Sequence, residues 1–476
     1  MTALDQSIHG LRRRFPELSA AQLLTRRQAW IARALAAMGL VLMIWDLRFT
    51  LRAALFFTTL VYLLTLAYRC YLANVALRQP GCLTVSDAQA RAIPDDMLPI
   101  YTVLIPAFHE SQVIARTLAA IGRLEYPRHL LDVKLLLEED DSETIAAATA
   151  AAGCHSVDIV RIPAAAPRTK PKACNYGLLS ARGEFVTIFD AEDRPEPLQL
   201  RRAVAAFYRV DSSVACLQAK LSYHNPQQNL ITRLFTVEYL TWFSLLLPAQ
   251  ANGGGPVPLG GTSMHIRRHV LEAVGAWDPY NVTEDADLGM RLLRMGFQTA
   301  VLDSTTYEEA NSDFVNWVKQ RSRWYKGYLQ TWLVHMRHPW QLRSEIGLRP
   351  LITFSLLVAA TPVLALINPT FWLLTLIWFA AKPHFIEVLF GGWIFYPSLF
   401  CLIAGNMAVL YLGLIAIRVT DKTELVAPVA LIPIYWLMMS VAAVKAVLQL
   451  ATAPSFWEKT THGLDQLGKS EALIGG

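Results

Sequence analysis

Residues 185–193 read FVTIFDAED, and they set the pattern for the middle of the chain. The first half is rich in aromatic and β-branched residues, which is typical of a buried β-strand. Three carboxylates follow within four positions, at Asp190, Glu192 and Asp193. Carboxylates this close repel one another unless a cation lies between them, and their oxygen atoms suit a hard divalent ion such as Mg2+ or Mn2+. The alternative is a solvent-exposed acidic turn that caps the next helix.

Two similar runs lie on the amino-terminal side of this strand. YTVLIPAF (101–108) and VKLLLEEDD (133–141) are apolar and β-rich, and helical patterns fill the intervals between the runs. This alternation predicts an α/β domain built on a mostly parallel sheet. Ligands of such sheets bind beyond the carboxyl ends of the strands, so Asp140 and Asp141 should face the same crevice as Asp190.

The composition argues against a purely soluble enzyme. Of 476 residues, 54% are apolar and 17% are charged, against roughly 25% charged in soluble domains. The six cysteines form no CxxC pair, so neither a zinc site nor a disulfide framework is indicated. The net charge of +5 is small, and the basic residues lie near long apolar runs at both ends of the chain. This distribution favours a lipid bilayer as a partner and argues against a nucleic acid.

We expect a multi-pass protein of the inner (plasma) membrane with its α/β domain in the cytoplasm. The arginine-rich start favours a cytoplasmic amino terminus, and a helical hairpin returns the chain to the same side of the membrane. The expected parts are a cytoplasmic amino-terminal segment (1–29), a transmembrane hairpin (30–74), the cytoplasmic α/β domain with interface helices (98–345), a transmembrane block (350–450) and a cytoplasmic tail (451–476).

About six spanning helices are expected, each close to the roughly 20 residues that a span needs. Two form the hairpin. The other four are placed near 350–367, 369–389, 395–417 and 425–450. The apolar stretch at 230–247 carries too many polar residues to span, so we expect it to lie along the membrane.

Two further motifs place polar groups near the crevice. KPKACN (170–175) supplies two cations, Lys170 and Lys172, and the amide of Asn175, which suit a diphosphate and sugar hydroxyls; alone it would be a solvent-facing basic loop. Lys172 and Asn175 are the residues expected to bind the substrate. TED (283–285) begins a helical stretch. Such residues are favoured at helix amino termini, so capping alone explains this motif when it is taken by itself.

QRSRW (320–324) lies in a stretch crowded with aromatic and basic residues. That combination is typical of a helix at a membrane interface. Gln320 and Arg323 are also long enough to reach a diphosphate, and Trp324 offers an aromatic face to a sugar ring.

In this order and spacing, four motifs resemble those of the processive family 2 glycosyltransferases, which include the cellulose, curdlan and hyaluronan synthases. They are DDS (140–142), DAED (190–193), TED (283–285) and QRSRW (320–324). The resemblance covers about residues 98–345 by motif and the whole chain by its two membrane blocks. It implies a GT-A fold, a UDP-sugar donor and a divalent metal, either Mg2+ or Mn2+.

The resemblance also assigns roles to the acidic motifs. Asp140 and Asp141 would contact the nucleotide, and Asp190 with Glu192 would take the two metal-binding positions. Because a glutamate stands at the second position, either Glu192 or Asp193 is expected to face the metal.

The later motifs would complete the catalytic centre. Asp285 would be the general base, with Glu284 beside it, and Gln320, Arg323 and Trp324 would bind the diphosphate and the end of the acceptor.

Two terminal stretches carry a looser resemblance. FWEKT (456–460) is similar to the gating loop that covers the active site of cellulose synthases, with its last two residues in the opposite order. FPELSAAQLLTRRQ (15–28) is similar to a short segment of related bacterial membrane glycosyltransferases and carries no catalytic role.

The expected function is inverting transfer of a sugar from a UDP-sugar to a growing β-linked polysaccharide, coupled to its export. Glucose is the expected sugar, by resemblance to glucan synthases. The expected partners are the donor, the polysaccharide, the lipid bilayer and, as a further candidate, accessory export proteins. One alternative is a single transfer to a lipid acceptor. Another is a membrane protein that only binds nucleotide sugar, in which Asp285 is a helix cap.

Overall fold

The computed structural model describes residues 2–79, 81–152, 157–460 and 463. Within this part of the chain, nine strands form one mixed sheet in the order β1-β9-β7-β8-β5-β2-β3-β4, with β6 paired to β9. The strands are β1 (Cys82–Leu83), β2 (Tyr101–Ala107), β3 (Leu131–Glu138), β4 (Asp158–Ile162), β5 (Phe185–Ile188), β6 (Arg194–Pro195), β7 (Val214–Tyr223), β8 (Met264–Arg267) and β9 (Gln298–Glu308).

The sheet is mostly parallel, as the sequence predicts. Strands β5, β2, β3 and β4, adjacent in this order, run parallel to one another, and β7 is parallel to β9. Strand β8 runs antiparallel to both β5 and β7 and joins the two halves. Since β2 and β5 are adjacent and parallel, the residues that follow them meet at one edge of the sheet.

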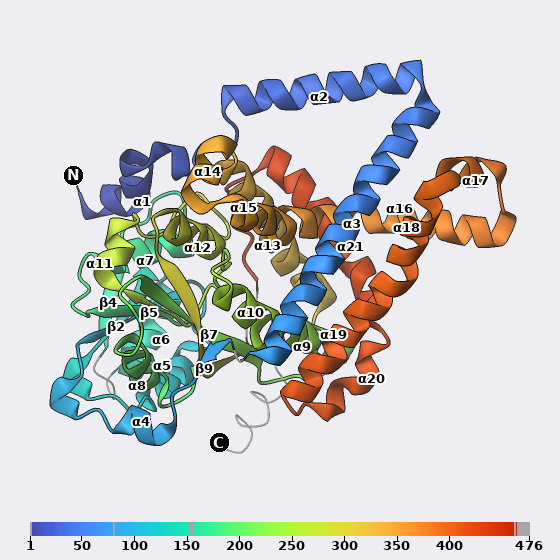
Figure 1. Ribbon diagram of the computed structural model, residues 1–476. Helices are drawn as coiled ribbons and strands as arrows, with labels where there is room; N and C mark the ends of the chain where they lie inside the picture. The colour runs from blue at the N-terminus through green and yellow to red at the C-terminus, as the bar shows by residue number, and fades with distance from the viewer. Residues whose placement is uncertain (1, 80, 153–156, 461–462, 464–476) are drawn as a thin grey trace.

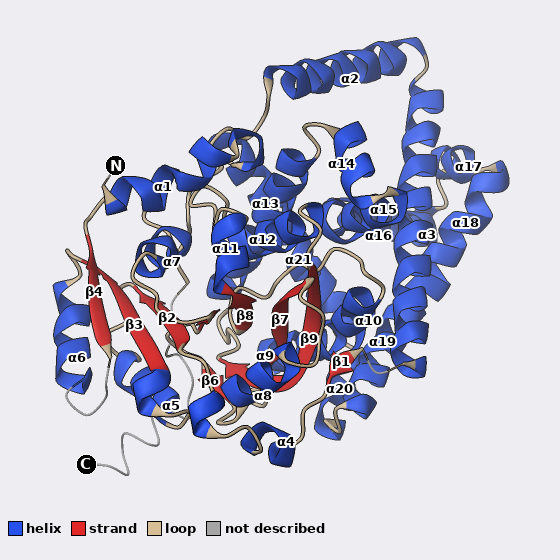
Figure 2. Ribbon diagram, turned by 60° about the vertical axis from the view of Figure 1, so that its left-hand side comes forward, coloured by secondary structure: helices blue, strands red, loops and turns tan. Residues whose placement is uncertain are grey.

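Helices cover both faces of the sheet (Figure 2). Successive side chains of a strand point to opposite faces. Leu104 therefore packs in the core that includes α7, whereas Val103 packs in the core that includes α5. The helices of this domain are α4 (Asp87–Arg91), α5 (Ile114–Gly122), α6 (Ser142–Ala152), α7 (Lys170–Leu178), α8 (Gln199–Phe207), α11 (Arg268–Ala273) and α12 (Glu284–Arg294).

The remaining helices lie beside the sheet domain or extend from it (Figure 1). They are α1 (Ala3–Arg14), α2 (Arg26–Trp45), α3 (Leu47–Arg78), α9 (Leu230–Tyr239), the π-helical turn η4 (Leu240–Leu246), α10 (Leu247–Asn252), α13 (Phe314–His335), α14 (Pro339–Ile346), α15 (Leu348–Phe354), the π-helical turn η5 (Ser355–Ala359), α16 (Ala360–Ala381), α17 (His384–Phe390), α18 (Phe395–Phe400), the π-helical turn η7 (Cys401–Gly405), α19 (Asn406–Val419), α20 (Val426–Val429) and α21 (Ile432–Thr452).

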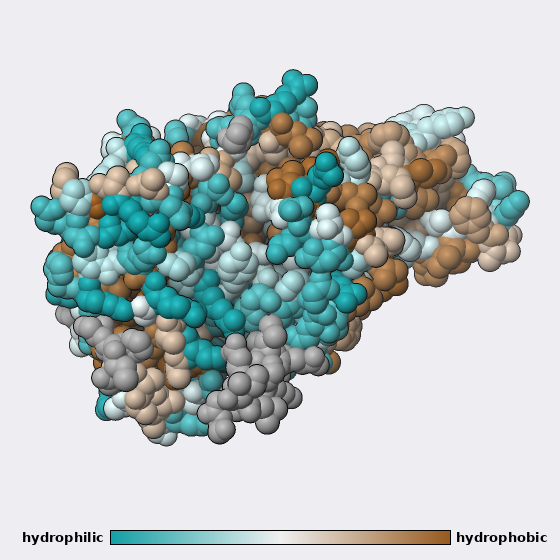
Figure 3. All heavy atoms as spheres, turned by 90° about the horizontal axis from the view of Figure 1, so that it is seen from below, coloured by the Kyte–Doolittle hydropathy of each residue, from teal (hydrophilic) through white to brown (hydrophobic). Residues whose placement is uncertain are grey.

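Six helices of the described chain are long and apolar enough to cross a membrane. They are Arg26–Trp45, Leu47–Arg78, Leu230–Asn252, Leu348–Ala381, Gly392–Val419 and Ile432–Thr452. Figure 3 shows apolar residues gathered over the helical half of the molecule, while the half that contains the sheet is largely hydrophilic. These features give the chain the makeup of a membrane protein.

Two of these helices differ from the sequence expectation. Leu348–Ala381 is continuous, with Pro369 inside it, where the sequence analysis places two spans. Three long apolar helices therefore follow residue 347 in the described chain, where about four spans are expected. Leu230–Asn252 reaches the length and hydropathy of a span, but 61% of its apolar window is buried inside the protein. Its residue Tyr239 packs on Tyr223 of β7, with ring centroids 4.3 Å apart, so this helix is held against the sheet.

Close packing of α12 supplies a stability prediction. A Cβ atom added at Gly289 would lie 2.1 Å from the carbonyl oxygen of Val257, which is backbone and cannot rotate away. We expect Gly289→Ala to destabilise the fold by about 1–3 kcal/mol, the usual range for overpacking. Thermal unfolding in detergent measures this change.

The matched control is Gly10→Ala in α1, where the nearest atom to the new methyl group would be 3.8 Å away. This helical substitution should be neutral or stabilising by up to about 1 kcal/mol. Equal unfolding temperatures for the two variants would contradict the packing described for α12.

Candidate active site

A cavity of about 240 Å3 lies beyond the carboxyl ends of β2 and β5. Its walls come from segments far apart in sequence: the ends of these strands, the start of α7, the loop at Gly260 and Gly261, the start of α12, one face of α13 and the carboxyl-terminal tail. The charged residues that line it are Glu110, Glu138, Arg168, Lys170, Asp190, Glu192, Glu284, Asp285, Glu308, Arg323 and Lys459. Carboxylates outnumber cations in this list. A bound cation would therefore reduce the repulsion among the carboxylates.

Lys170 is the cation at the centre of this group. It begins α7, and its Nζ forms an ion pair with Asp190 and donates a hydrogen bond to the carbonyl oxygen of Gly261 (2.9 Å). Burial alone would lower the pKa of Lys170, but Asp190 and Glu284 raise it above its ordinary value. The lysine is therefore a permanent positive charge in the cavity.

The three carboxylates of DAED do not share one environment. Asp190 and Glu192 line the cavity, whereas Asp193 is only 1% exposed and lies behind it. One oxygen of Asp193 accepts a hydrogen bond from the backbone N–H of Asp190 (2.7 Å) and contacts the hydroxyl of Thr262. Burial, followed by repulsion from Asp190 and Glu192, raises the pKa of Asp193 well above its usual range. Asp190 and Glu192 are therefore the two carboxylates of this motif that line the cavity.

Glu284 and Asp285 form the first turn of α12 and line the same cavity as Asp190. Burial raises the pKa of Glu284 to about 8 and that of Asp285 to about 6. Gly261, at φ +88°, brings its backbone close, since a Cβ atom there would lie 3.3 Å from Asp285 Oδ2. Thr283 stands at the N-cap position but makes no capping hydrogen bond through its side chain. Capping therefore does not explain the threonine of this motif.

Helix α13 presents the QRSRW motif on two faces. Gln320, Arg323 and Trp324 line the cavity, as the 3.6-residue repeat requires of positions i, i+3 and i+4. The guanidinium of Arg323 stacks 4.6 Å from the ring centroid of Trp457 in the tail, and its buried Nε has no hydrogen-bond partner among the described residues. Arg321 points to the other side, where it pairs with Glu238 at 2.8 Å and 2.5 Å.

The described part of the tail forms one wall of the cavity. Lys326 of α13 donates to the carbonyl oxygen of Phe456 (2.7 Å). Lys459 then reaches the α/β domain, where it contacts the carbonyl oxygens of Phe108 and His109, the latter at 3.0 Å. Trp457 lies between these two anchors and lines the cavity. The rest of the predicted tail, residues 461–462 and 464–476, lies outside the described residues.

Asp140 and Asp141 do not line the cavity. Asp140 forms an ion pair with Arg168 (2.6 Å), which does line it. Asp141 is buried and accepts hydrogen bonds from the backbone N–H groups of His109 (2.6 Å) and Thr144 (3.2 Å). Although burial opposes it, these bonds hold the pKa of Asp141 below its ordinary value. Asp141 thus fixes the loop that follows β2.

Lys172 and Asn175 also lie away from the cavity, which corrects the expectation that they contact the diphosphate and sugar. Lys172 is fully buried in an ion pair with Glu138 (2.6 Å). Asn175 donates to the carbonyl oxygens of Ser7 (3.0 Å) and Trp277 (2.9 Å). Both residues are engaged in holding α7 in place, so neither side chain is available to a ligand.

No role was predicted from the sequence for four charged residues of the cavity, Glu110, Glu138, Arg168 and Glu308, and of the two lysines in KPKACN, Lys172 was favoured over Lys170. Lys170 and Glu308 each carry a signal that could have been used. Lys170 precedes Pro171, and proline at the first helical turn marks a helix start. Glu308 ends β9, which is parallel to β7, and so has the same strand-end placement as the residues after β5. Lys459 lies in FWEKT (456–460), the stretch expected to cover the active site, and its contacts with Phe108 and His109, about 350 positions away in sequence, place it at the cavity.

A second cavity, of about 260 Å3, adjoins the first. Asp285 and Trp324 line both. The second cavity continues between α9, α13 and the long apolar helices, where Leu357, Thr361 and Met439 form part of its wall. The two cavities thus run from the carboxyl edge of the sheet to the membrane helices and meet at Asp285.

Residues 99–327 match the family model described as "Glycosyltransferase like family 2". The probable glycosyltransferase YdaM of Bacillus subtilis (strain 168) is 26% identical over 235 residues, 48% of this chain and 55% of the relative. A beta-monoglucosyldiacylglycerol synthase of Synechocystis sp. (strain ATCC 27184 / PCC 6803 / Kazusa) is 26% identical over 308 residues, 60% of this chain and 64% of the relative. The chain spans about half the length of most of the curated relatives that it matches.

Among solved structures, the chain is similar to the mannosyltransferase PcManGT from Pyrobaculum calidifontis in complex with GDP-Man and Mn2+. The TM-score is 0.50 and the identity 18%, over 83% of this chain and 99% of that one. At this identity the likeness concerns the fold. Together with the family match, it confirms the expected GT-A fold, and residues 99–327 are similar to the glycosyltransferases of family 2.

The raised pKa of Glu284 predicts a pH-dependent effect on stability. Because the pKa is about 8 in the folded chain against an ordinary value of 4.5, the folded protein holds a proton that the unfolded protein releases. The contribution of this residue to stability is therefore lost as the pH rises from about 4.5 to about 8. We expect Glu284→Gln to raise the unfolding temperature relative to wild type, by an amount that grows from about pH 5 to about pH 8.

Thermal unfolding of both proteins across this pH range tests the prediction. Glu272→Gln, at a half-exposed surface position, is the matched control and should show no such growth. A Glu284→Gln advantage that is constant with pH would contradict the raised pKa.

Proposed function

We propose that this protein is an inverting membrane glycosyltransferase that transfers a sugar from a UDP-sugar to the hydroxyl of a growing β-linked polysaccharide. The α/β domain would lie on the cytoplasmic side of the plasma membrane. The observation that supports the proposal most is that two cavities meet at Asp285. One is charged and lies at the edge of the sheet, and the other continues between the membrane helices.

The charged cavity suits a nucleoside diphosphate sugar. Lys170, Arg323 and Lys459 supply positive charge that a diphosphate would neutralise. In the proposed reaction these cations stabilise the negative charge that develops on the departing diphosphate.

A divalent metal fits the carboxylates described above. Asp190 and Glu192 would hold Mg2+ or Mn2+, which would neutralise phosphate charge when bound. Among the described residues, no group of three or more His, Cys, Asp or Glu side chains is arranged to hold a metal ion. One or two protein carboxylates are nevertheless sufficient for such ions when phosphate and water oxygens complete the shell.

Asp285 is the proposed general base. Its pKa of about 6 leaves it ionised at neutral pH yet basic enough to accept a proton, which is the range in which general bases work best. The acceptor hydroxyl gives its proton to Asp285 while its oxygen bonds to the anomeric carbon. The bond from that carbon to the diphosphate oxygen breaks, and UDP leaves with the electron pair. Attack opposite the leaving group converts an α-linked donor into a β-linked product.

The second cavity is the proposed acceptor site. Sugar rings stack on aromatic side chains, and several line this cavity. They are Tyr239, Trp242, Phe243, Trp324, Tyr325, Tyr328, Tyr435 and Trp436. An acceptor that lies along these rings would present its terminal hydroxyl to Asp285 and extend toward the bilayer, a direction compatible with export.

A lipid acceptor is the second candidate. Apolar residues of the long helices, such as Leu357 and Met439, line the same cavity. The curated proteins to which this chain is similar also include some named beta-monoglucosyldiacylglycerol synthase. In this alternative a single sugar is transferred to a hydroxyl of a lipid headgroup that enters from the bilayer.

The proposed base makes Asp285→Asn a direct test. We expect turnover, measured as UDP release by purified protein with a panel of UDP-sugars, to fall at least about a hundredfold, because general base catalysis contributes at least that factor. The matched control is Asp211→Asn in an exposed turn, which should retain wild-type turnover. Unchanged turnover in Asp285→Asn would remove the base and favour a protein that only binds nucleotide sugar.

The size of the product separates the two acceptors. With a radiolabelled UDP-sugar and membranes that contain the protein, we expect labelled material of high molecular mass that linkage-specific β-glycan hydrolases degrade. Label confined to a lipid extract, with one or two sugars per lipid, would overturn the polysaccharide proposal in favour of the lipid acceptor.

A further inference from the structure

We propose that the amino-terminal segment, residues 3–22, positions the catalytic centre through contacts that lie outside the charged cavity. None of its residues lines the charged cavity. It nevertheless binds the three elements that bring Lys170, Asp285 and Arg323 into that cavity. The structural part of the inference stands on the contacts below, and its catalytic consequence rests on the proposed function.

The first element is α7, which begins at Lys170. Helix α1 of the segment packs on α7, and Asn175 of α7 donates a hydrogen bond to the carbonyl oxygen of Ser7 (3.0 Å). The same amide also exchanges two hydrogen bonds with the backbone of Trp277, at 2.9 Å and 3.1 Å. Asn175 therefore joins the segment, α7 and the loop that leads to α12.

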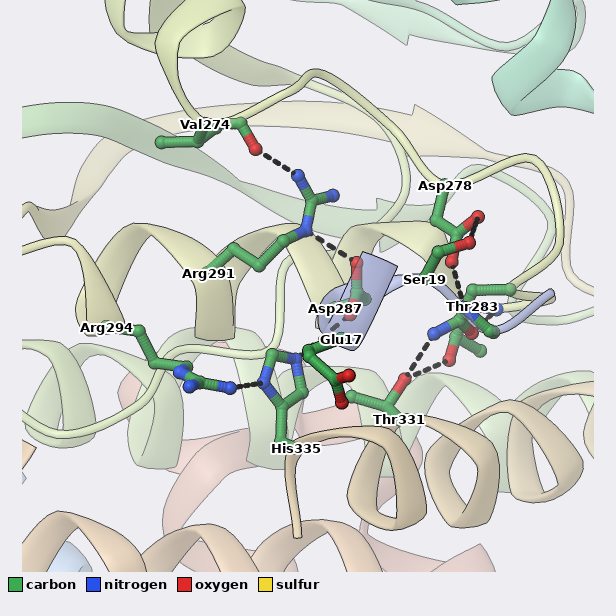
Figure 4. Close-up of polar contacts among 12 residues, drawn as sticks. Glu17, Ser19, Val274, Asp278, Thr283, Asp287, Arg291, Arg294, Thr331 and His335 are labelled. Carbon is green, nitrogen blue, oxygen red and sulfur yellow. Dashed lines mark hydrogen bonds and ion pairs between the residues drawn. The ribbon is translucent and has the colours of Figure 1, made fainter. Parts of the chain in front are cut away.

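The second element is this loop, residues 274–283. Asp278 is fully buried and accepts hydrogen bonds from the backbone N–H of Ala20 (2.5 Å) and the hydroxyl of Ser19 (3.3 Å). Figure 4 shows Asp278 and Ser19 facing each other across this junction. A Cβ atom at Gly275 would lie 2.6 Å from Leu11 Cδ1, so the loop and α1 are also in close apolar contact.

The third element is α13, which carries Arg323. Arg337 follows its carboxyl end and is only 6% exposed. Its guanidinium donates to the carbonyl oxygens of Glu17 (2.7 Å) and Ser19 (3.0 Å), and also contacts those of Pro16 and Gln22. A buried cation is stable only when such acceptors are present, so the position of α13 depends on the segment.

Further contacts connect the three elements to one another. Asp287 of α12 pairs with Arg291 (2.8 Å) and with His335 of α13 (3.0 Å). Asn281 of the loop donates to Thr331 of α13 (2.9 Å). Figure 4 shows Asp287, Arg291 and His335 grouped between the two helices. Since Asp287 is two residues from Asp285, a shift of the loop or of α13 would displace the proposed base, Asp285.

Asp278 and Arg337 are thus positioning residues. They touch neither cavity, and they act through the loop and α13. Both residues are buried and charged. A buried carboxylate or guanidinium that loses its hydrogen-bond partners costs more free energy than the loss of a contact on the surface.

Asp278→Asn tests the inference. The amide keeps the size of the side chain but places its N–H group against the backbone N–H of either Ala20 or Tyr280, which donate to the two oxygen atoms of the carboxylate. We expect faster hydrogen exchange of the backbone amides in residues 279–287, measured by mass spectrometry on the full-length protein in detergent. We also expect a fall in kcat of about tenfold or more with little change in donor KM, because small misplacement of a catalytic group affects the chemical step.

The matched control is Asp5→Asn in the same segment. Asp5 pairs with Arg13 on the surface of α1, and its loss should leave both exchange and turnover at the wild-type level. If Asp278→Asn does not fold, Arg337→Lys keeps the positive charge but shortens its reach to the carbonyl oxygens, and the same two changes are expected.

A folded variant with wild-type exchange in residues 279–287 would overturn the inference, whatever its turnover. Loss of donor binding in proportion to kcat would also overturn it, because that result indicates general destabilisation. If wild-type protein transfers no sugar from any UDP-sugar while exchange still rises in the variant, the proposed function fails and the structural role of the segment stands.

Discussion

The ion pair between Lys170 and Asp190 is the contact on which the candidate active site depends. It joins the start of α7 to the end of β5, and the hydrogen bond from Lys170 to Gly261 adds the loop that approaches Asp285. Several carboxylates surround this pair at close range. Removing a cation from such a group leaves buried negative charge without a partner, which costs several kcal/mol (about 3–5). The geometry of the cavity therefore depends on the balance between the charge of Lys170 and that of the surrounding carboxylates, as well as on packing.

Much of the fold follows from local patterns. The runs that became β2, β3 and β5 are apolar, and each is short and followed by polar residues, so strand assignment and a parallel sheet follow from the sequence. The long membrane helices are less well predicted at their ends. Pro369 marks a break in a soluble helix, but a long apolar helix tolerates proline when its neighbours satisfy the freed backbone groups, and Leu348–Ala381 is continuous. The burial of Leu230–Asn252 depends on partners in β7 that no local pattern reveals.

The candidate site was predictable by motif but not by orientation. Asp190, Glu192, Asp285, Arg323 and Trp324 all line one cavity, as the order of the motifs indicates. The expectation that Lys172 contacts the diphosphate was wrong for a geometric reason. Positions 170 and 172 are about 200° apart around a helix axis, so only one of them faces the ligand. Without the phase of α7, sequence cannot decide between them, and it likewise cannot show that Asn175 faces the amino-terminal segment.

Trp324 forms part of the wall of both cavities, and this shared wall has a thermodynamic consequence. A side chain that shifts when one site fills changes the free energy of filling the other. Linkage makes that effect equal in both directions, so an acceptor that strengthens donor affinity is itself held more tightly once the donor is present. One indole ring can thereby set the order in which two substrates are retained.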